Sequence, residues 1–555
     1  MKQTTLFDDS FNGAEAQSAE AQLQRQVEIA KDPLTAQIVT PIIGSILRDY
    51  ENLNQETDRI INDTLNFLIE VVPEIANIEV KDYVQDSGFS SFPIGKSQFP
   101  ISKLGNTIDE MKGKWIIAID ESMVDEEMLS GNISYRHSAA FGMRIDDKGG
   151  EPKEKMLAVS SAAKIQEEEH FKDKMMFISY LMNLFTAYYT AKFLTSIGEQ
   201  VHSIIIHGPL IRQLGPFMKL GFKRNLLHKV FSLGKNVELG DHISPDIKNL
   251  AEGGLLEEIL GSNDYKWCLK QLKGGQIIQF EDYHSTVSGV ALYLCLLKRL
   301  YDLSRSKNFY MIGCVETARS SEYSDIYFRY QVERYFDKNK DKRQAFEELM
   351  RRFGIQPQED LKPCFLQLRE KAGWDDEKLS FFSVKYDAAQ QRICYTNPVP
   401  IRRYFSVLDN QNVIGDAQLA QRISSTSDSV QNLALQNMLE QTLKFPDYKV
   451  LMSYVRTSEL KAPIRVEFFE TGNWHNVVPF VYAVSQPYSS FGLPIFLYFA
   501  DKIARVPKSV ISTVTTELLM KKAVEYVTKN PQGDMHFVQI VNALLNKFRR
   551  DFTQR

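Results

Sequence analysis

The segment that decides the fold reads Trp115-Ile-Ile-Ala-Ile-Asp120-Glu121-Ser122. Its apolar run predicts a short buried strand that stops at an aspartate followed by a second acid. A carboxylate at the end of a buried strand is held on a rigid element, and metal-dependent phosphoryl-transfer sites place their oxygen ligands there. A strand that ends at a solvated aspartate turn has the same pattern, so this segment alone does not decide between the two.

A second strand of the same build strengthens the case for a site. The run Val201-His-Ser-Ile-Ile-Ile206 ends on His207, followed by Gly-Pro-Leu. Alternating apolar residues predict a strand pair within 131–144, and the apolar run 174–196 predicts a helix packed on a sheet. The order strand, strand pair, helix, strand predicts an α/β fold with a central mixed sheet flanked by helices.

The rest of the chain suggests several further regions. Residues 309–315 predict a third apolar strand that ends on Glu316, and two amphipathic helices are expected between residues 34 and 72. Later strands are expected at 380–386, 392–396 and 464–469, the last with one buried face. We therefore expect a flexible N-terminal arm (1–30), a helical N-terminal region (31–110), a core (111–510) with a helical insertion at about 215–305, and C-terminal helices (511–555).

Bulk composition bounds the class of protein. The 555 residues suggest two to four folding units, and the net charge of −4 gives no global nucleic-acid footprint, so any basic groove must be local. The five cysteines are scattered without a CxxC pair, which argues against a zinc ribbon and for a reducing compartment. The N-terminus has no signal-like pattern and no run of 18 apolar residues occurs, so we expect a cytoplasmic protein without a membrane anchor.

Four short segments, taken in order, resemble motifs of the NurA nuclease family. Ala118-Ile-Asp120-Glu-Ser122 is similar to the family's strand ending in Asp-Gly-Ser, and 204–210 to its strand ending in Asp-Gly-Ser-Leu. The strand 309–315 runs into a polar turn, as in the family. Gly492-Leu-Pro494 and the following Ala500-Asp501-Lys-Ile-Ala504 resemble its late Gly-Tyr-Pro segment and the helix with Ala-His-x-x-Ala.

The resemblance implies an RNase H-like core and a DNA nuclease that depends on Mn²⁺, or on Mg²⁺. Family members are typically homodimers that work with a hexameric HerA-type ATPase, which moves DNA through the complex. The associated biology is DNA-end processing in repair and, in bacteria, antiviral defence. The chain contains no G-x-x-x-x-G-K-[ST] motif, so any ATP hydrolysis would come from such a partner.

The chain also departs from the family pattern. Position 207 is histidine instead of an acid, position 493 is leucine instead of tyrosine, and position 501 is aspartate where histidine is frequent. The helix 174–196 has no acid for the family's helical glutamate, which leaves Glu167, Glu168, Glu169 or Asp173. An acid and a histidine have in effect traded places. That is compatible with a working site and equally with a decayed, non-catalytic subunit that guides DNA or supports the ATPase.

The candidate residues follow from these matches. Asp120, His207 and Asp501 are the expected metal ligands, with Glu316 as a further catalytic carboxylate, while Glu121 should point to the opposite face of its strand. Ordinary structural roles exist for each: a hydrogen-bonded cap for His207, a helix N-terminus for Asp501, a salt bridge for Glu316. The basic residues suited to DNA phosphates, or simply to solvent, are Arg319, Lys502 and Arg505.

A separate signal lies near the N-terminus. Gln3-Thr-Thr-Leu6-Phe7 resembles the short peptide that binds bacterial sliding clamps, in which the glutamine and the Leu-Phe pair enter an apolar pocket. A segment outside the folded core that displays such anchors is suited to capture by a partner, although five-residue patterns also arise by chance.

Overall fold

The computed structural model describes residues 96–128, 131–144, 153–166, 171–232, 254–274, 286–316, 333–357, 392–401 and 450–505, apart from a few positions inside these ranges, together with scattered single residues. The chain divides into two compact units, residues 1–72 and 73–555. The sheet and its helices belong to the second unit. The helices expected between 34 and 72 and most of the expected strand 380–386 lie outside the described residues.

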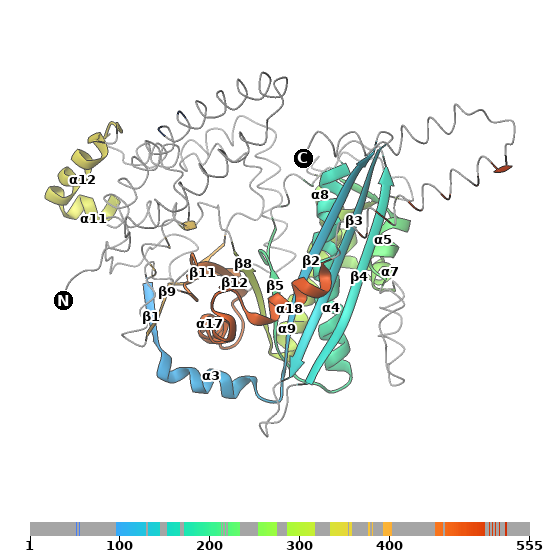
Figure 1. Ribbon diagram of the computed structural model, residues 1–555, viewed down its shortest axis with the longest axis horizontal. Coiled ribbons are helices and arrows are strands. Elements are labelled where there is room, and N and C mark those ends of the chain that lie inside the picture. The colour runs from blue at the N-terminus through green and yellow to red at the C-terminus, as the bar shows by residue number, and fades with distance from the viewer. Residues whose placement is uncertain are drawn as a thin grey trace, which may run out of the picture. The chain divides into compact units, whose positions relative to one another are not determined.

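A ten-stranded mixed sheet forms the centre of the second unit (Figure 1). Its order is β1-β9-β11-β12-β8-β5-β2-β3-β4, with β10 paired to β11. Only β5 runs parallel to its neighbours, β2 and β8, and the other pairs are antiparallel. The strands are β1 (Lys96–Pro100), β2 (Trp115–Met128), β3 (Gly131–Arg144), β4 (Lys153–Gln166), β5 (Val201–His207), β8 (Tyr310–Val315), β9 (Arg392–Thr396), β10 (Val399–Pro400), β11 (Val450–Val455) and β12 (Ile464–Phe469).

The arrangement of β2 to β8 confirms the predicted fold class. Three antiparallel strands in chain order (β2, β3, β4) are followed by a helix and by two strands, β5 and β8, that add in parallel on the other side of β2. This is an RNase H-like core. Such parallel connections need a crossover segment, and helices α4 and α9 supply the two crossovers into β5 and β8.

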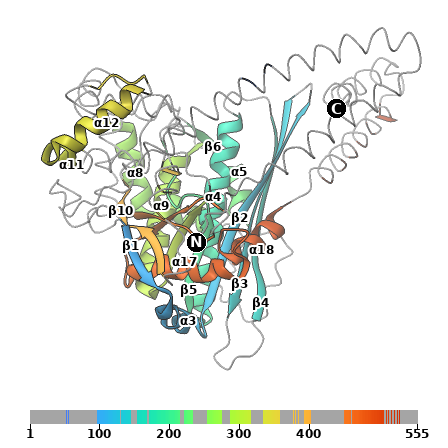
Figure 2. The ribbon, with the colours of Figure 1, turned by 60° about the vertical axis from the view of Figure 1, so that its left-hand side comes forward.

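Two local predictions about the first strands were wrong. The strand expected to stop at Asp120 continues to Met128, because β3 pairs with it along its full length even after β5 has ended. The segment 131–144 is one 14-residue strand instead of a strand pair, since β4 supplies the partner on its other side. Figures 1 and 2 show β2, β3 and β4 as three long strands lying side by side.

Helices cover the sheet on both faces. One face packs against α17 (Val477–Ser485) and α18 (Ile495–Ala504), whose apolar side chains join Ile116, Ala118 and Ile205 in one core. The other face packs against α4 (Phe171–Ser196), which in turn contacts α9 (Gly289–Lys307). Because β2 is covered on both sides, Ile116 to Ile119 are all fully buried. The same reasoning explains β12, which is buried on both faces and not on one as expected.

Smaller elements surround this core. Helix α4 is apolar on nearly all sides because it lies between the sheet and α9. The remaining helices are α3 (Leu104–Met111), α5 (Arg224–Val230), α7 (Gly254–Gly261), α8 (Asn263–Gly274), α11 (Glu333–Lys338) and α12 (Lys340–Arg352), and β6 (Gly221–Lys223) pairs with β7 (Thr286–Ser288). Within the described part of the chain, no helix has the length and apolar character needed to span a membrane.

Candidate active site

Asp120 lies where the parallel pairing of β2 with β5 ends. The last paired residues are Ile119 of β2 and Ile206 of β5. The next residue along β2 is Asp120, and the next along β5 is His207. Side chains alternate along a strand, so Asp120 shares the face of Ile116 and Ala118, which is the face covered by α18. Asp120 is only 3% exposed. The strand pairing thus places one carboxylate and one imidazole together at a fixed point under α18.

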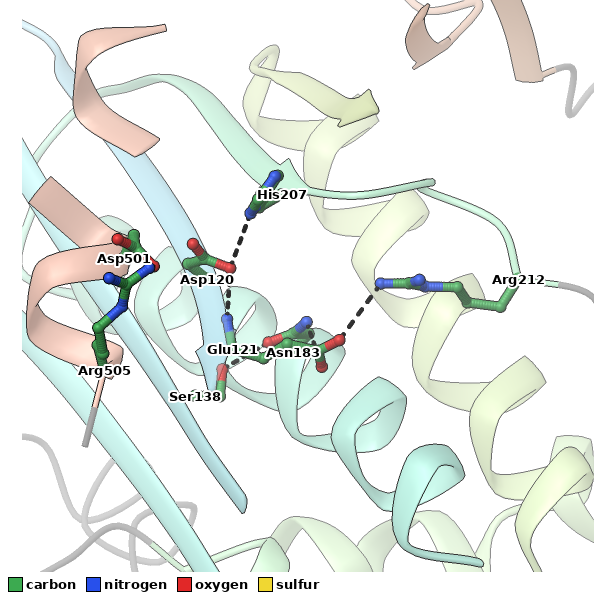
Figure 3. Close-up of polar contacts among 8 residues, drawn as sticks. All are labelled: Asp120, Glu121, Ser138, Asn183, His207, Arg212, Asp501 and Arg505. Atoms are coloured by element: carbon green, nitrogen blue, oxygen red, sulfur yellow. Dashed lines mark hydrogen bonds and ion pairs between the residues drawn. The ribbon is translucent and has the colours of Figure 1, made fainter. Parts of the chain in front are cut away.

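Two groups hold the Asp120 carboxylate (Figure 3). Its Oδ1 accepts a hydrogen bond from the backbone N–H of Glu121 at 2.7 Å and lies 3.0 Å from Nδ1 of His207. Oδ2 accepts no hydrogen bond from any residue in the described ranges. One oxygen is therefore anchored while the other is left for a ligand.

The charge of Asp120 also acts on His207. Burial lowers the pKa of the imidazole, but the hydrogen bond and the negative charge of Asp120 outweigh burial, and Glu316 adds to them, so the pKa is raised from its ordinary value. If Nδ1 carries the shared proton, Nε2 is the nitrogen that can accept a proton or bind a metal. The His207 side chain is one-third exposed, so Nε2 can be reached.

Helix α18 brings Asp501 to the same face. The helix packs across β2 and β3, and Figure 3 shows Asp501 on α18 beside the strand that carries Asp120. Its Oδ1 lies 3.3 Å from Nη2 of Arg505, one turn further along the helix, while the Lys502 ammonium lies over the ring of Tyr498. Arg505 is therefore paired with an acid, and its side chain remains 63% exposed.

The other predicted site residues have varied positions. Glu316 follows β8, is exposed, and acts on His207 through its charge. Asp173 is in the first turn of α4, which packs on the face opposite α18, so it lies away from Asp120. The remaining predicted residues lie outside the described residues: Glu167, Glu168, Glu169, Arg319, Gln3, Leu6 and Phe7.

Glu121 points to the opposite face, as predicted. Its Oε2 accepts a hydrogen bond from Nδ2 of Asn183 on α4 at 2.9 Å, and Oε1 lies 3.6 Å from the Arg212 guanidinium. Asn183 also accepts a hydrogen bond from the Ser138 hydroxyl at 2.7 Å. Burial raises the pKa of Glu121, although Arg212 partly opposes the shift. Sequence reasoning missed Asn183; a polar residue inside the apolar run 174–196 was the available signal.

A buried acid far along the chain anchors the turn that follows His207. Glu467 on β12 is 2% exposed and accepts hydrogen bonds from the N–H groups of Leu210 and Ile211, at 2.8 and 3.4 Å. Its Oε1 lies 2.9 Å from Nη2 of Arg465. The turn crosses β8 so closely that a Cβ on Gly313 would lie 2.5 Å from the Leu210 nitrogen. The position of His207 therefore depends on β12, and nothing in the sequence pattern indicated this.

The donor set has a definite chemical character. Asp120, Asp501 and His207 offer carboxylate oxygens and an imidazole nitrogen, the ligand types that divalent cations of the Mn²⁺ kind accept. In the conformation described, however, no three His, Cys, Asp or Glu side chains among the described residues gather closely enough to hold a metal ion. Asp120 and His207 contact each other instead, and Asp501 contacts Arg505. A metal would have to replace the Asp501–Arg505 contact, whereas Asp120 Oδ2 and His207 Nε2 are not used in these contacts.

The fold and this strand-end site define an α/β protein with an RNase H-like core. Residues 394–506 match the model of the NurA domain. The match includes β11, β12, α17 and α18, and therefore Glu467 and Asp501.

Solved structures were compared as well. The NurA nuclease from Sulfolobus solfataricus is 12% identical, with a TM-score of 0.40 over 87% of this chain and 98% of that one. A NurA structure with manganese is 10% identical, with a TM-score of 0.32 over 85% and 98% of the two chains. A NurA structure bound to dAMP and manganese is 11% identical, with a TM-score of 0.28 over 73% and 89%. No curated protein sequence matches the chain.

Proposed function

We propose that the protein is a metal-dependent nuclease that hydrolyses phosphodiester bonds of DNA. The observation that carries the proposal is the Asp120 carboxylate, buried at the end of the β2–β5 pairing and anchored through Oδ1, while Oδ2 accepts no hydrogen bond from the described residues. The match of residues 394–506 to the NurA domain supports the same reaction class. The neighbouring imidazole of His207 and the carboxylate of Asp501 supply further groups on the same face.

Asp120, His207 and Asp501 would hold the divalent metal, either Mn²⁺ or Mg²⁺, with Glu316 as a nearby carboxylate. When bound, the metal would activate a water molecule and stabilise the charge on the phosphate. The chain's own contribution is positioning: the Glu121 N–H and His207 fix the orientation of the Asp120 carboxylate. With Nδ1 hydrogen-bonded to Asp120, Nε2 is the His207 nitrogen that would bind the metal.

Metal binding and cleavage by the purified protein test this proposal together. We expect titration calorimetry to detect Mn²⁺ binding, and Asp120→Ala to weaken it at least about tenfold because a charged ligand is lost. We also expect cleavage of labelled DNA with Mn²⁺ and none with EDTA. A wild-type protein that binds no Mn²⁺ and leaves single-stranded and duplex DNA intact would refute the proposal.

One observation favours a second candidate, a NurA-like subunit without catalysis. The Asp120–His207 and Asp501–Arg505 pairs occupy the side chains that would ligate a metal, and no metal-binding group of three forms within the described ranges. Such a subunit would guide DNA or support a partner ATPase. It would bind DNA without Mn²⁺-dependent cleavage, which is the result that separates the two candidates.

We infer that a hexameric HerA-type ATPase is the partner that moves DNA to this site, and that the protein acts as a homodimer in DNA-end processing or antiviral defence. The inference rests on the NurA domain and on a sequence that lacks a P-loop. Co-expression with a HerA-type ATPase of the same organism should yield one complex on size-exclusion chromatography. Two separate peaks at micromolar concentration, with cleavage of long DNA undiminished by the partner's absence, would contradict it.

A further inference from the structure

Aromatic side chains gather where the loop before α18 meets that helix. The rings of Tyr488 and Phe491 stack with centroids 6.0 Å apart and an interplanar angle of 19°. Tyr498 on α18 contacts both edge-on, with each centroid 5.5 Å away. These three residues are called the aromatic platform. Tyr488 is 43% exposed and is one of only six large apolar or aromatic side chains exposed among the described residues.

Two ammonium groups flank the platform. Lys502 lies over the Tyr498 ring, 5.2 Å from its centroid. The stem of Lys461 lies against Gly492, the residue after Phe491, because a Cβ on Gly492 would lie 3.0 Å from the Lys461 Cγ. Neither lysine forms an ion pair with an acid in the part of the chain that the structure describes. Their positive charges are therefore available to an anionic partner.

The platform adjoins the candidate active site. Tyr498 precedes Asp501 by three residues and Lys502 by four, so the three lie on neighbouring turns of one side of α18. Next to Tyr498, Phe499 packs on Phe141 of β3 with centroids 5.0 Å apart, which fixes this part of the helix on the sheet. Tyr498 of the platform and Asp501 of the candidate site are therefore neighbours on α18.

We propose that the platform stacks unpaired bases of a single-stranded nucleic acid, while Lys461 and Lys502 contact its phosphates. An exposed aromatic face such as that of Tyr488, combined with nearby cations, is how proteins hold single strands without reading sequence, because every base has a π-face. A duplex keeps its base faces stacked on one another and offers them to no side chain. The nucleic-acid class of the ligand rests on the proposed function, and the preference for a single strand is additional to it.

Binding of a fluorescein-labelled dT20 oligonucleotide, followed by anisotropy in EDTA, tests this inference without any cleavage. We expect Tyr488→Ala to raise the dissociation constant about tenfold, the loss typical of one stacked base. Tyr498→Ala should also weaken binding, because Tyr498 contacts the Tyr488 and Phe491 rings edge-on and supports them. Tyr488→Phe should bind as the wild type does, because the ring face is retained. Duplex binding should be equal in all these proteins.

The control variant is Ile197→Ala. Ile197 is 44% exposed, close to the 43% of Tyr488, but it precedes the start of β5, at the opposite end of that strand from His207. It should leave dT20 binding unchanged. A second control uses an abasic strand of the same length, which should bind at least about tenfold more weakly because no bases remain to stack.

Several outcomes would overturn the inference: no binding of dT20, equal binding of dT20 and the abasic strand, or Tyr488→Ala binding as tightly as the wild type. Failure of the nuclease proposal is a different result. If dT20 binding depends on the tyrosines but Mn²⁺ supports no cleavage, the single-strand inference holds and the nuclease proposal is refuted. If the protein cleaves DNA but substitution of Tyr488 and Tyr498 leaves dT20 binding unchanged, the nuclease proposal holds and the single-strand inference is refuted.

Discussion

Asp120→Asn is expected to reduce Mn²⁺-dependent DNA cleavage by at least about a hundredfold, since a metal supplies several kcal/mol of transition-state stabilisation and each 1.4 kcal/mol is tenfold in rate. The amide keeps the volume of the side chain and can still accept the Glu121 N–H bond. It removes the negative charge and the open oxygen that a cation needs. Initial rates on a labelled substrate, with folding checked by circular dichroism, measure the loss.

The matched control is Glu121→Gln. Glu121 is the adjacent acid on the same strand, but it faces α4, where the amide can keep the hydrogen bond from Asn183. We expect this variant to retain most of the wild-type rate. Equal rates for wild type and Asp120→Asn would remove Asp120 from the site. If Glu121→Gln lost as much cleavage rate as Asp120→Asn, the active site would have to be assigned to the other face of the sheet.

The sequence was sufficient to predict four strands of the sheet closely. Strands β5, β8, β9 and β12 have close to their predicted limits, because each is a continuous apolar run or a compact β-branched segment. The second half of β2 could not be predicted. Residues 121–128 include four acids and no apolar run, and only pairing with the whole of β3 makes them a strand. Such long antiparallel pairing is a tertiary property.

The candidate site divides in the same way. Asp120 and His207 could be proposed because each ends the apolar part of a strand, and parallel register brings such ends together. The contacts that position these two side chains could not be predicted from the sequence. Asn183 reaches Glu121 across 62 residues, and Glu467 reaches Leu210 across 257. No local spacing encodes such pairs, so the sequence identified the chemical groups and not the residues that support them.

The Glu467 contact should have the largest effect on stability. Glu467→Ala would leave the Arg465 guanidinium, whose side chain is 11% exposed, without this carboxylate, and would leave the Leu210 and Ile211 N–H groups without an acceptor. Removing one partner of a buried pair costs about 3–5 kcal/mol. Urea denaturation followed by tryptophan fluorescence measures the change, since Trp474 packs against Phe468 of the same strand.

Restoring an apolar environment separates a charge effect from simple loss of packing. In the double variant Arg465→Met with Glu467→Leu, no charge remains at this pair of positions. Replacing a buried ion pair by apolar residues of similar volume often leaves the free energy of unfolding unchanged. We expect it to regain most of the stability lost in Glu467→Ala, apart from about 1–3 kcal/mol for each backbone N–H left unpaired. A Glu467→Ala protein less than about 1 kcal/mol below the wild type, the range of an exposed pair, would show that water reaches Arg465. In that case β12 would not be what holds the His207 turn in place.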